Sequence, residues 1–543
     1  MKNFLLAMLI FFICNYSFAQ TINEKKIYEG KDVDIYSLWE FQYDAKTGSY
    51  AYTKYDTVTQ KTKLTGSRGN STDYSYVNSY STVFDNSGNY YTTASNSKDE
   101  ILTDYFFLKN GQELRKFENI NDALTLRGDF IYFSAREKEK EFLVKYNVTT
   151  GNFEYGNKYD TINFVYMKET PYSEGEPAFE LGFTKDGKPY YQASVGNKQM
   201  IVVGTEEMKK YDEVQFYNVI QDKNGAICYV AKNYKDGNNE YFLVQGETEY
   251  KKFTGVNMPI VFDVANVPVY SASDSPEEYP SEQFVVKGSE IISRRFSKGI
   301  YDILVTPSGK IAYNGSDTLA DGSFMNVLVV DGKEIARYPS IYNIKFRKND
   351  VPVFVASDKN NASFVVEGNK IVSDKYGYVY DLDIKKNGDL MYTGVNYGDY
   401  DKKIPDKFYY ILGEKKYGPV TDMIMGERLA DQVVFNDDGD YVYTATTSKP
   451  GDYENTKFFA SSVDWKSEKY DGIMDLCTYK NDFYYTGTNY REDGTSTYQL
   501  FKNDEKLGPE YAMITDLKLD KEKGIITFVA SKKGKVLFVE IKL

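Results

Sequence analysis

The chain has 543 residues, of which 52 are tyrosine and 34 phenylalanine, and it contains no histidine. The lack of histidine excludes Ser-His-Asp and Cys-His catalysis and every metal site that needs an imidazole ligand. Lys and Arg number 66 against 79 Asp and Glu, which gives a formal net charge of −13. An acidic chain without a basic stripe argues against nucleic acid and against an anionic membrane surface as partners.

Residues 1–19 have the pattern of a secretory signal peptide. Lys2 is the charged region, Phe4 to Ile13 the apolar region, and Ser17-Phe18-Ala19 a small-x-small cleavage site. The mature chain then begins at Gln20 and carries one positive charge less, −14. We therefore expect a protein exported to the periplasm or to the outside of the cell.

Two other interpretations of this leader are less favoured. A membrane anchor is disfavoured because the apolar run is too short to cross a bilayer. A lipid on Cys14 is disfavoured because Ile13 is bulky where a lipobox needs a small residue. No later segment is apolar enough to cross a membrane, so we expect no integral membrane segment in the mature chain.

A spacing recurs along the rest of the chain, in which a turn residue is followed six residues later by a small residue. Gly48/Lys54 is a degenerate first copy. A period of about 40 residues with strand-like content predicts an all-β chain of β-propeller blades. The regular pairs are Gly88/Ala94, Asp129/Ala135, Gly187/Ala193, Gly225/Ala231, Asn266/Ala272, Gly309/Gly315, Asp350/Ala356, Gly388/Gly394, Gly439/Ala445, Asn481/Gly487 and Gly524/Ala530.

The copy around Asp350 shows the four strands that we expect in each repeat. Residues 341–346 alternate and predict a first strand, and a tight turn leads to a second strand at residues 351–356. Residues 363–366 predict a third strand, and a hairpin turn leads to a fourth that starts at 371–373. An aromatic residue such as Tyr338 or Tyr376 follows the fourth strand. The small residue at the end of the second strand is expected where neighbouring sheets crowd together.

This pattern resembles the TolB-like and WD-repeat-like β-propeller repeats of exported bacterial proteins. Lys185-Asp186-Gly187-Lys188, Val330-Asp331-Gly332-Lys333-Glu334, Asn436-Asp437-Asp438-Gly439-Asp440 and Pro307-Ser308-Gly309-Lys310 carry the resemblance. It extends over nearly the whole mature chain. The resemblance implies the fold, whereas the family includes scaffolds, partner-binding modules and propeller domains attached to hydrolases.

Two intervals between the turn residues are longer than the others and suggest domain borders. The spacing is 58 residues between Asp129 and Gly187 and 51 between Gly388 and Gly439, against 38 to 43 elsewhere. The last repeat lacks an outer strand, which residues 25–28 can supply. We therefore predict two six-bladed propellers, one formed by residues 20–165 plus 430–543 and closed by pairing of the terminal strands, the other inserted at 170–428. A seven-plus-five split and one ring of twelve blades are the alternatives. Residues 57–81, rich in Ser, Thr, Asn and Tyr, suggest a large loop.

Few motifs that carry chemistry are present. The chain has no Gly-x-Ser-x-Gly elbow, Walker A loop or dinucleotide fingerprint. Cys228 and Cys477 lie in apolar runs and suggest two buried thiols rather than a disulfide. No cofactor or metal is expected. Calcium is the one metal to weigh, at the oxygen-rich segments 85–89 and 436–440, although ordinary turns prefer the same residues.

The loops between the second and third strands vary most in length, and several are rich in Tyr and Asp. Variable loops on a rigid scaffold are where binding usually resides, and tyrosine supplies a large contact area at low entropic cost. The same composition is also typical of ordinary hydrophilic hairpin loops. The candidate ligand-binding residues on this loop face are Tyr234, Asp236, Tyr279, Tyr397, Asp399, Tyr400, Asp452, Tyr453, Tyr490 and Asp493.

These patterns lead us to expect an exported, non-enzymatic propeller that binds a protein or glycan through its variable loops. The alternative is a carboxylate-dependent enzyme that acts on a polysaccharide, which needs two Asp or Glu side chains about 5–10 Å apart. A component of an envelope assembly is a third interpretation. No catalytic residue can be singled out among the carboxylates.

Overall fold

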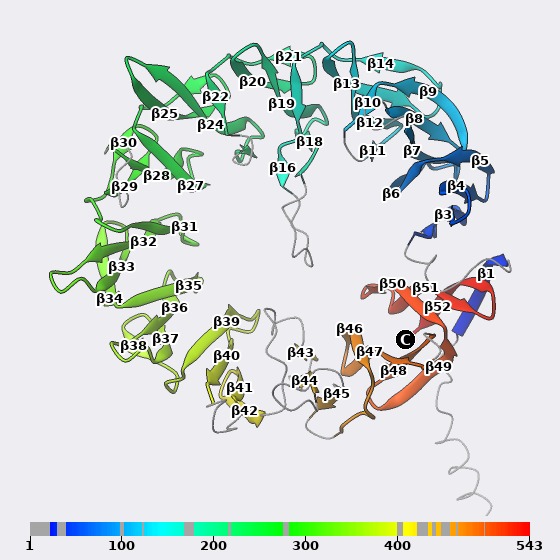
Figure 1. Cartoon of the computed structure of the whole chain (residues 1–543). Helices are drawn as coiled ribbons and strands as arrows, with labels where there is room; N and C mark the ends of the chain where they lie inside the picture. The colour runs from blue at the N-terminus through cyan, green and yellow to red at the C-terminus, as the bar shows by residue number, and fades with distance from the viewer. Residues whose placement is uncertain are drawn as a thin grey trace, which may run out of the picture. The chain divides into compact units, whose positions relative to one another are not determined.

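The computed structural model describes residues 22–29, 40–97, 103–121, 124–167, 179–215, 219–274, 282–398, 406–420, 433–436, 441–446, 457–462, 465–492 and 495–543. These residues form 52 β-strands, and none of them lies in a helix. The prediction of an all-β chain is therefore confirmed. The strands are grouped into small antiparallel sheets, most of them four-stranded, that follow one another in chain order (Figure 1).

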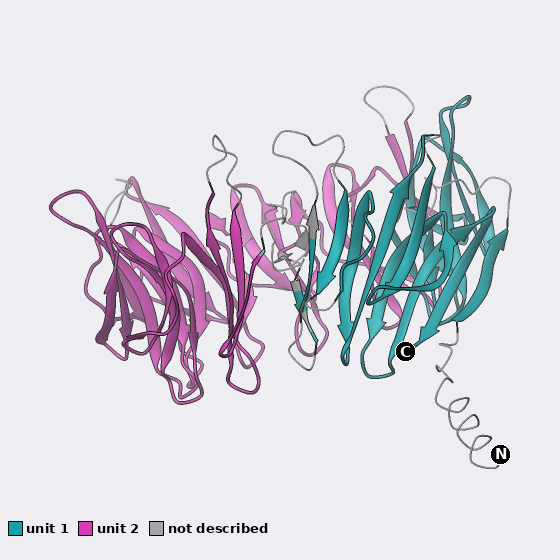
Figure 2. Cartoon of the chain, turned by 90° about the horizontal axis from the view of Figure 1, so that it is seen from below, with its two compact units in different colours: residues 1–94, 108–114, 422–543 teal, residues 95–107, 115–421 magenta. Residues whose placement is uncertain are grey.

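The chain divides into two compact units (Figure 2). Unit 1 consists of residues 1–94, 108–114 and 422–543, and unit 2 of residues 95–107 and 115–421. The predicted grouping of the blades into two rings of six, with residues 170–428 inserted, stays a prediction.

Unit 1 holds four sheets, and the sheet β6-β7-β8-β9 is divided between the two units. The strands of these five sheets are β1 (Ile22–Glu29), β2 (Gln42–Asp44), β3 (Ser49–Asp56), β4 (Lys61–Gly66), β5 (Gly69–Tyr74), β6 (Tyr76–Phe84), β7 (Tyr90–Ser97), β8 (Thr103–Lys109), β9 (Gln112–Phe117), β43 (Val433–Phe435), β44 (Tyr441–Thr446), β45 (Phe458–Ser462), β46 (Gly472–Tyr479), β47 (Asp482–Tyr490), β48 (Ser496–Lys502), β49 (Glu505–Tyr511), β50 (Met513–Asp520), β51 (Ile525–Lys532) and β52 (Lys535–Lys542).

Unit 2 holds the remaining strands, in seven further four- or five-stranded sheets and one short pair, β16-β17. They are β10 (Asn119–Ile120), β11 (Thr125–Arg127), β12 (Phe130–Glu137), β13 (Lys140–Asn147), β14 (Phe153–Tyr155), β15 (Thr161–Asn163), β16 (Tyr166–Met167), β17 (Phe179–Glu180), β18 (Gly182–Phe183), β19 (Pro189–Val195), β20 (Lys198–Val203), β21 (Glu206–Glu207), β22 (Glu213–Val214), β23 (Ile220–Gln221), β24 (Ile227–Lys235), β25 (Asn238–Gln245), β26 (Thr248–Glu249), β27 (Gly255–Phe262), β28 (Pro268–Ser273), β29 (Gln283–Lys287), β30 (Glu290–Ile291), β31 (Gly299–Val305), β32 (Ile311–Thr318), β33 (Phe324–Val330), β34 (Lys333–Tyr338), β35 (Ser340–Phe346), β36 (Pro352–Ser357), β37 (Ser363–Glu367), β38 (Lys370–Ile371), β39 (Tyr378–Ile384), β40 (Leu390–Asn396), β41 (Lys407–Leu412) and β42 (Lys415–Val420).

The sheet β35-β36-β37-β38 shows the repeat in its regular form. Its strands pair antiparallel in chain order, and their bounds match the four strands predicted around Asp350. The second strand, β36, is buried along its whole length because it lies between β35 and β37 and between neighbouring sheets. A four-stranded meander of this kind is the blade of a β-propeller.

The turn between the first and second strands explains the recurrent turn residue. In the turn at residues 85–89, the Gly88 N–H donates to the Asp85 carbonyl at 2.9 Å, and the Asp85 N–H donates to the Asn89 carbonyl at 2.9 Å. This is a three-residue hairpin loop whose last residue takes a left-handed conformation. Glycine, asparagine and aspartate tolerate that conformation best, and φ is 77° at Gly88, 64° at Asn266 and 62° at Asp350.

The small residue six positions later lies where an aromatic ring of the preceding sheet packs against the second strand. A Cβ atom at Gly315 of β32 would lie 2.4 Å from the ring of Phe296, which follows β30 in the preceding sheet. Gly394 of β40 meets Tyr376 in the same way, at 2.6 Å. Where the residue is alanine, as at Ala272, it is fully buried in a cluster with Phe253 of the preceding sheet. Steric crowding between consecutive sheets therefore accounts for the small residue.

Polar contacts also link neighbouring sheets at intervals of one repeat. The Lys223 N–H donates to Asn266 Oδ1 at 3.0 Å, and Asn266 Nδ2 donates to Asp222 Oδ2 at 2.8 Å. The Ser308 N–H donates to Asp350 Oδ1 at 3.0 Å. The left-handed Asn and Asp residues therefore join the turns of consecutive sheets as well as forming them.

The two ends of the described chain lie in one sheet of unit 1. β1 pairs antiparallel with β52, from Ile22 opposite Ile541 to Glu29 opposite Lys535 (Figure 1). Ile27 and Tyr28 pack against the same hydrophobic cluster as β50 to β52. Tyr511 Oη donates to Glu24 Oε1 at 2.8 Å. The pairing covers the outer edge of β52 and removes an exposed row of backbone donors and acceptors.

The prediction of a large loop at residues 57–81 is wrong. The segment contains β4, β5 and the start of β6, and alternate side chains such as Leu64, Ser71 and Tyr74 are buried. Its Thr and Tyr residues favour strands and outweigh the turn-forming Ser and Asn.

Cys228 and Cys477 are free thiols. Burial raises the pKa of both, for Cys477 to about 11.

Candidate functional site

Four of the ten predicted ligand-binding residues are described in the structure: Tyr234, Asp236, Tyr397 and Tyr490. The other six lie outside the described residues. They are Tyr279, Asp399, Tyr400, Asp452, Tyr453 and Asp493.

Asp236 has a structural explanation that needs no ligand. It forms the two-residue turn between β24 and β25 with Gly237, and φ is positive at both residues, 52° and 84°. Asp-Gly is a preferred sequence for this hairpin turn.

Tyr234 and Tyr490 occupy equivalent positions near the ends of β24 and β47, and both are largely exposed, at 64% and 63%. Their backbone N–H groups donate to Asp212 Oδ2 and Asp471 Oδ2, each at 2.8 Å. Each aspartate also pairs with a lysine of the preceding sheet, which for Asp212 is Lys198 at 2.7 Å. The two backbones are thus held by the structure, and both phenol rings reach solvent.

Tyr397 lies beside two other tyrosines, Tyr378 and Tyr380. It follows β40, and the ring lies 3.0 Å from the point where a Cβ atom at Gly377 would stand. Gly377 is followed by Tyr378, the first residue of β39, and Tyr380 lies two residues further along the same strand. Tyr342, from β35 of the preceding sheet, donates its hydroxyl to the Val379 carbonyl at 2.9 Å. We call Tyr342, Tyr378, Tyr380 and Tyr397 the tyrosine cluster.

Stacked rings organise the tyrosine cluster. The rings of Tyr342 and Tyr378 stack with centroids 5.5 Å apart and planes 13° apart. Tyr380 lies tilted against Tyr378, with centroids 5.8 Å apart. Tyr342 and Tyr380 are half-buried, whereas Tyr378 is 40% and Tyr397 56% exposed. The cluster therefore presents two aromatic rings to solvent on a support of two others.

Two carboxylates adjoin the tyrosine cluster. Asp381 follows Tyr380 at a bulge of β39 with φ of 57°, and Asp406, which is buried, accepts the Gly398 N–H at 2.6 Å. Burial raises the pKa of Tyr380 well above its ordinary value, and the negative charges of Asp381 and Asp406 raise it further. Burial also raises the pKa of Tyr397, with Tyr378 and Asp406 adding to the effect. These two phenols are therefore neutral at physiological pH.

Tyr342, Tyr378 and Tyr380 were not predicted because they lie in first strands, whereas the predicted residues lie in the loops between second and third strands. A signal for two of them exists in the first strands of three consecutive sheets. Tyr301-Asp302-Ile303, Tyr342-Asn343-Ile344 and Tyr380-Asp381-Leu382 share one pattern. The pattern recurs at the same position of each repeat, counted back from the turn residues Gly309, Asp350 and Gly388.

The bulge in the first strand carries an aspartate with positive φ in several sheets. Asp475 of β46 stands at this bulge with φ of 59° and accepts the Thr486 hydroxyl at 3.3 Å. Burial raises the pKa of Asp475, and burial likewise raises that of Glu40. No contact among the described residues brings these two carboxylates together, so the polysaccharide-cleaving alternative gains no acid-base pair here.

The oxygen-rich turn at residues 85–89 uses its carboxylate to hold the turn. Asp85 Oδ1 accepts the N–H groups of Ser87 and Asn89, both at 2.9 Å. Asp85 Oδ2 accepts Asn89 Nδ2 at 2.8 Å and the Tyr91 hydroxyl at 3.0 Å. In the second such segment, residues 437–440 lie outside the described part of the chain. Within the described ranges, no group of three or more Cys, Asp or Glu is placed to hold a metal ion.

Among known proteins, only solved structures match the chain, and their similarity to it is low. No protein-family model matches the chain, and no curated protein matches it. Similar solved structures include a eukaryotic initiation factor (10% identity, TM-score 0.32, 70% of this chain and 98% of that one). Another is the β-propeller domain of the Trilobed protease from Pyrococcus furiosus, at 9% identity and a TM-score of 0.24 over 55% of this chain and 95% of that one. A third is TolB from Acinetobacter baumannii, at 11% identity and a TM-score of 0.20 over 51% of this chain and 76% of that one.

Identities and TM-scores this low carry no argument about function. The fold class therefore rests on the chain's own sheets, and membership of a TolB-like family stays a prediction. No helix in the described part of the chain is long and apolar enough to cross a membrane.

Proposed function

We propose that this protein is an exported, non-enzymatic β-propeller that binds a protein or glycan through the tyrosine cluster at the loop face of unit 2. The observation that carries the proposal is the stacked pair Tyr342–Tyr378 with the exposed ring of Tyr397 beside it. Aromatic rings fixed by packing lose little entropy on binding and are frequent anchors of interfaces. The absence of histidine from the chain supports binding rather than acyl-transfer chemistry.

The binding proposal is tested with arrays of peptides and of neutral oligosaccharides. We expect ligands that bind the wild-type protein to lose about tenfold or more in affinity for the double variant Tyr378→Ala/Tyr397→Ala, because truncating aromatic anchors has effects of that size. Tyr55→Ala is the matched control, since Tyr55 in unit 1 is 56% exposed, as Tyr397 is. Ligands that bind wild type and double variant equally, or turnover of any arrayed compound, would contradict the proposal.

Export is a separate part of the proposal and has its own test. Fractionation of cells that produce the full chain should place it outside the cytoplasm, and sequencing of its N-terminus should start at Gln20. A variant with Leu9→Lys and Ile10→Lys, which breaks the apolar run, should stay in the cytoplasm. Cytoplasmic accumulation of the unaltered chain would refute export.

A further inference from the structure

The tyrosines of the first strands extend beyond the tyrosine cluster to a third sheet. Tyr301, Tyr342 and Tyr380 are each the third residue of a first strand, in β31, β35 and β39 of consecutive sheets. In β31 the bulge contains Tyr301 itself, and in the other two strands the bulge follows the tyrosine directly. Bulges re-aim side chains and are frequent next to active sites. We call Tyr301 and the tyrosine cluster together the tyrosine row.

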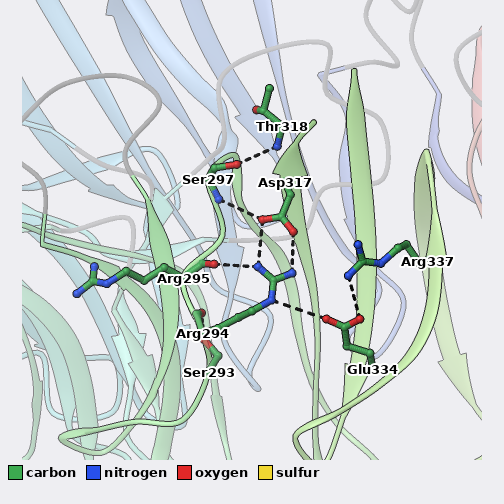
Figure 3. Close-up of polar contacts among 8 residues, drawn as sticks. All are labelled: Ser293, Arg294, Arg295, Ser297, Asp317, Thr318, Glu334 and Arg337. Atoms are coloured by element: carbon green, nitrogen blue, oxygen red, sulfur yellow. Dashed lines mark hydrogen bonds and ion pairs between the residues drawn. The ribbon is translucent and has the colours of Figure 1, made fainter. Parts of the chain in front are cut away.

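The backbone that leads to Tyr301 is fixed by an ion pair and by hydrogen bonds. Arg294, which follows β30 in the preceding sheet, binds both oxygens of Asp317 of β32, at 3.1 and 2.7 Å (Figure 3). The Ser297 N–H donates to Asp317 Oδ1 at 3.4 Å, and Ser297 Oγ accepts the Thr318 N–H at 2.8 Å. Tyr301 is 52% exposed. Its ring therefore reaches solvent from a fixed backbone, which lowers the entropic cost of binding.

The other end of the tyrosine row is fixed in a comparable way. The Gly377 N–H donates to Asn396 Oδ1 at 3.0 Å, which ties the start of β39 to the end of β40. Tyr378 is 40% exposed, and its ring is supported by the stacked ring of Tyr342 from the preceding sheet. Exposed rings on fixed backbones thus lie at both ends of the row.

The spacing of the row suits a long ligand with repeated units. Consecutive sheets pack about 10 Å apart, so three first strands extend the row over about 20 Å. A polysaccharide presents similar rings at regular intervals, and their C–H groups are attracted to the negative face of an aromatic ring. In an extended peptide, side chains of different shape alternate between two directions. A row of identical tyrosines therefore matches a polysaccharide better than a peptide.

Charge favours an uncharged polysaccharide over an anionic one. Burial raises the pKa of Tyr342, Tyr380 and Tyr397, so these phenols are neutral at physiological pH. The whole chain has a formal net charge of −13. That charge repels a polyanion over a longer range than a single contact.

We propose that the tyrosine row binds an extended, uncharged polysaccharide chain, which runs across the first strands β39, β35 and β31. Sugar rings stack on the exposed rings of Tyr378 and Tyr397 at one end and of Tyr301 at the other. This inference rests on the proposed binding function, because it names the ligand class for the tyrosine cluster and adds Tyr301 to the site.

The test measures binding of fluorescein-labelled oligosaccharides by fluorescence polarisation. The probes are two-unit and six-unit forms of neutral glucans, mannans, xylans and galactans, with a six-unit galacturonan as the anionic counterpart. Tyr301→Ala and Tyr378→Ala each remove a ring at one end of the row, whereas Tyr301→Phe removes only a hydroxyl. Tyr55→Ala is the control, since Tyr55 lies in unit 1 and is 56% exposed. Circular dichroism checks that each variant is folded.

We expect at least one neutral six-unit oligosaccharide to bind, and its two-unit form to bind about tenfold more weakly or worse, because only the longer chain reaches both ends. Tyr301→Ala and Tyr378→Ala should each weaken binding of the six-unit ligand about twofold to tenfold, the range of one aromatic contact. The double variant should show the product of the two losses, because the two rings lie too far apart to interact.

The remaining probes and variants test the chemistry of the contact. Tyr301→Phe should bind the six-unit ligand as the wild type does, because the ring face and not the hydroxyl makes the contact. Tyr55→Ala should also bind it unchanged. The galacturonan should bind about tenfold more weakly than the neutral ligand, or not at all.

Four results would overturn the inference. They are equal binding of the two-unit and six-unit forms, equal binding of the six-unit ligand by wild type and Tyr301→Ala, equal losses in Tyr301→Ala and Tyr301→Phe, and galacturonan that binds at least as tightly as the neutral ligands. If no neutral oligosaccharide binds but a peptide binds and depends on Tyr378 and Tyr397, the polysaccharide inference fails and the binding function stands. If no oligosaccharide or peptide binds, both fail.

Discussion

Glycine at the end of a second strand sets how closely two neighbouring sheets approach. Phe296 is fully buried, and its ring fills the space that a side chain at Gly315 would need. A Cβ atom 2.4 Å from two ring carbons is closer than such atoms pack in proteins. The ring must therefore move, and the tight packing around it resists that movement.

The first prediction concerns this contact. Gly315→Ala should lower the free energy of unfolding by about 1–3 kcal/mol, the usual effect of overpacking a core, measured by urea denaturation. Gly472→Ala is the control, because its Cβ atom would meet nothing closer than 3.9 Å and the change should be nearly neutral. Phe296→Leu in the Gly315→Ala background should recover part of the loss. Equal midpoints for Gly315→Ala and wild type would show that the sheets can separate freely.

The second prediction concerns the carboxylate of Asp475, whose pKa is raised by desolvation. Burial raises its pKa, so the folded state holds the proton more tightly than the unfolded state, and stability falls as pH rises above the ordinary value of about 3.9. Asp475→Asn should therefore raise the thermal midpoint at pH 7 and leave it unchanged at pH 3. Asparagine suits the conformation, as Asn343 shows at the same bulge. A midpoint lowered at pH 7 would mean that the charged form is stabilised in the folded protein.

At the scale of elements, the strand β1 completes a sheet that the C-terminal strands begin. Its backbone pairs with β52 along seven residue pairs, and Ile27 and Tyr28 contribute to the hydrophobic cluster. Without β1, the donors and acceptors on the outer edge of β52 would be free to pair with another chain.

The third prediction concerns this strand. A chain that starts at Gly30 should have a lower thermal midpoint than a chain that starts at Gln20 and should associate as its concentration rises, as measured by light scattering. Tyr511→Phe removes only the hydrogen bond to Glu24 and should cost about 0.5–1.5 kcal/mol. If the shortened chain stays monomeric and keeps the same thermal midpoint, β1 does not stabilise the sheet that it forms with β52.

Over the whole molecule, many aspartates are held in their charged form by hydrogen bonds between sheets. A hydrogen bond from Arg294 lowers the pKa of Asp317, and one from Lys198 lowers that of Asp212. The Ser308 hydroxyl and N–H lower the pKa of Asp350 to about 2. These groups bind protons less tightly in the folded state than in the unfolded state, so their stabilisation is lost as pH falls.

The fourth prediction is the pH profile of stability. The contribution of these aspartates is present above about pH 4, the ordinary range of the carboxyl, and disappears as pH falls through their lowered pKa values, which for Asp350 is about 2. The thermal midpoint should thus fall steeply between pH 4 and 2. It should be flat between pH 6 and 8, because histidine, which titrates near 6.5, is absent. Asp317→Asn should reduce the acid loss, and a steep slope near pH 6.5 would contradict the explanation.

The repeat itself was predictable because its signals are local. A left-handed turn residue, an alternating strand and a small residue lie within ten positions of one another, as around Asp350 and Ala356. Backbone strain and strand periodicity act over that range. The composition that suggested a loop at residues 57–81 was misleading, because Thr and Tyr form strands there once a neighbouring sheet packs against them.

The sequence by itself determined the all-β class, the strands of each repeat and the residues of its turns, since these follow from local conformational preference. Only the tertiary structure decided which exposed tyrosines meet. Tyr234, Tyr397 and Tyr490 are alike in sequence context, yet Tyr397 lies beside Tyr378 and Tyr380, and the ring of Tyr378 stacks on that of Tyr342. That meeting depends on how one sheet packs on the next, because Tyr342 reaches across from β35 to β39.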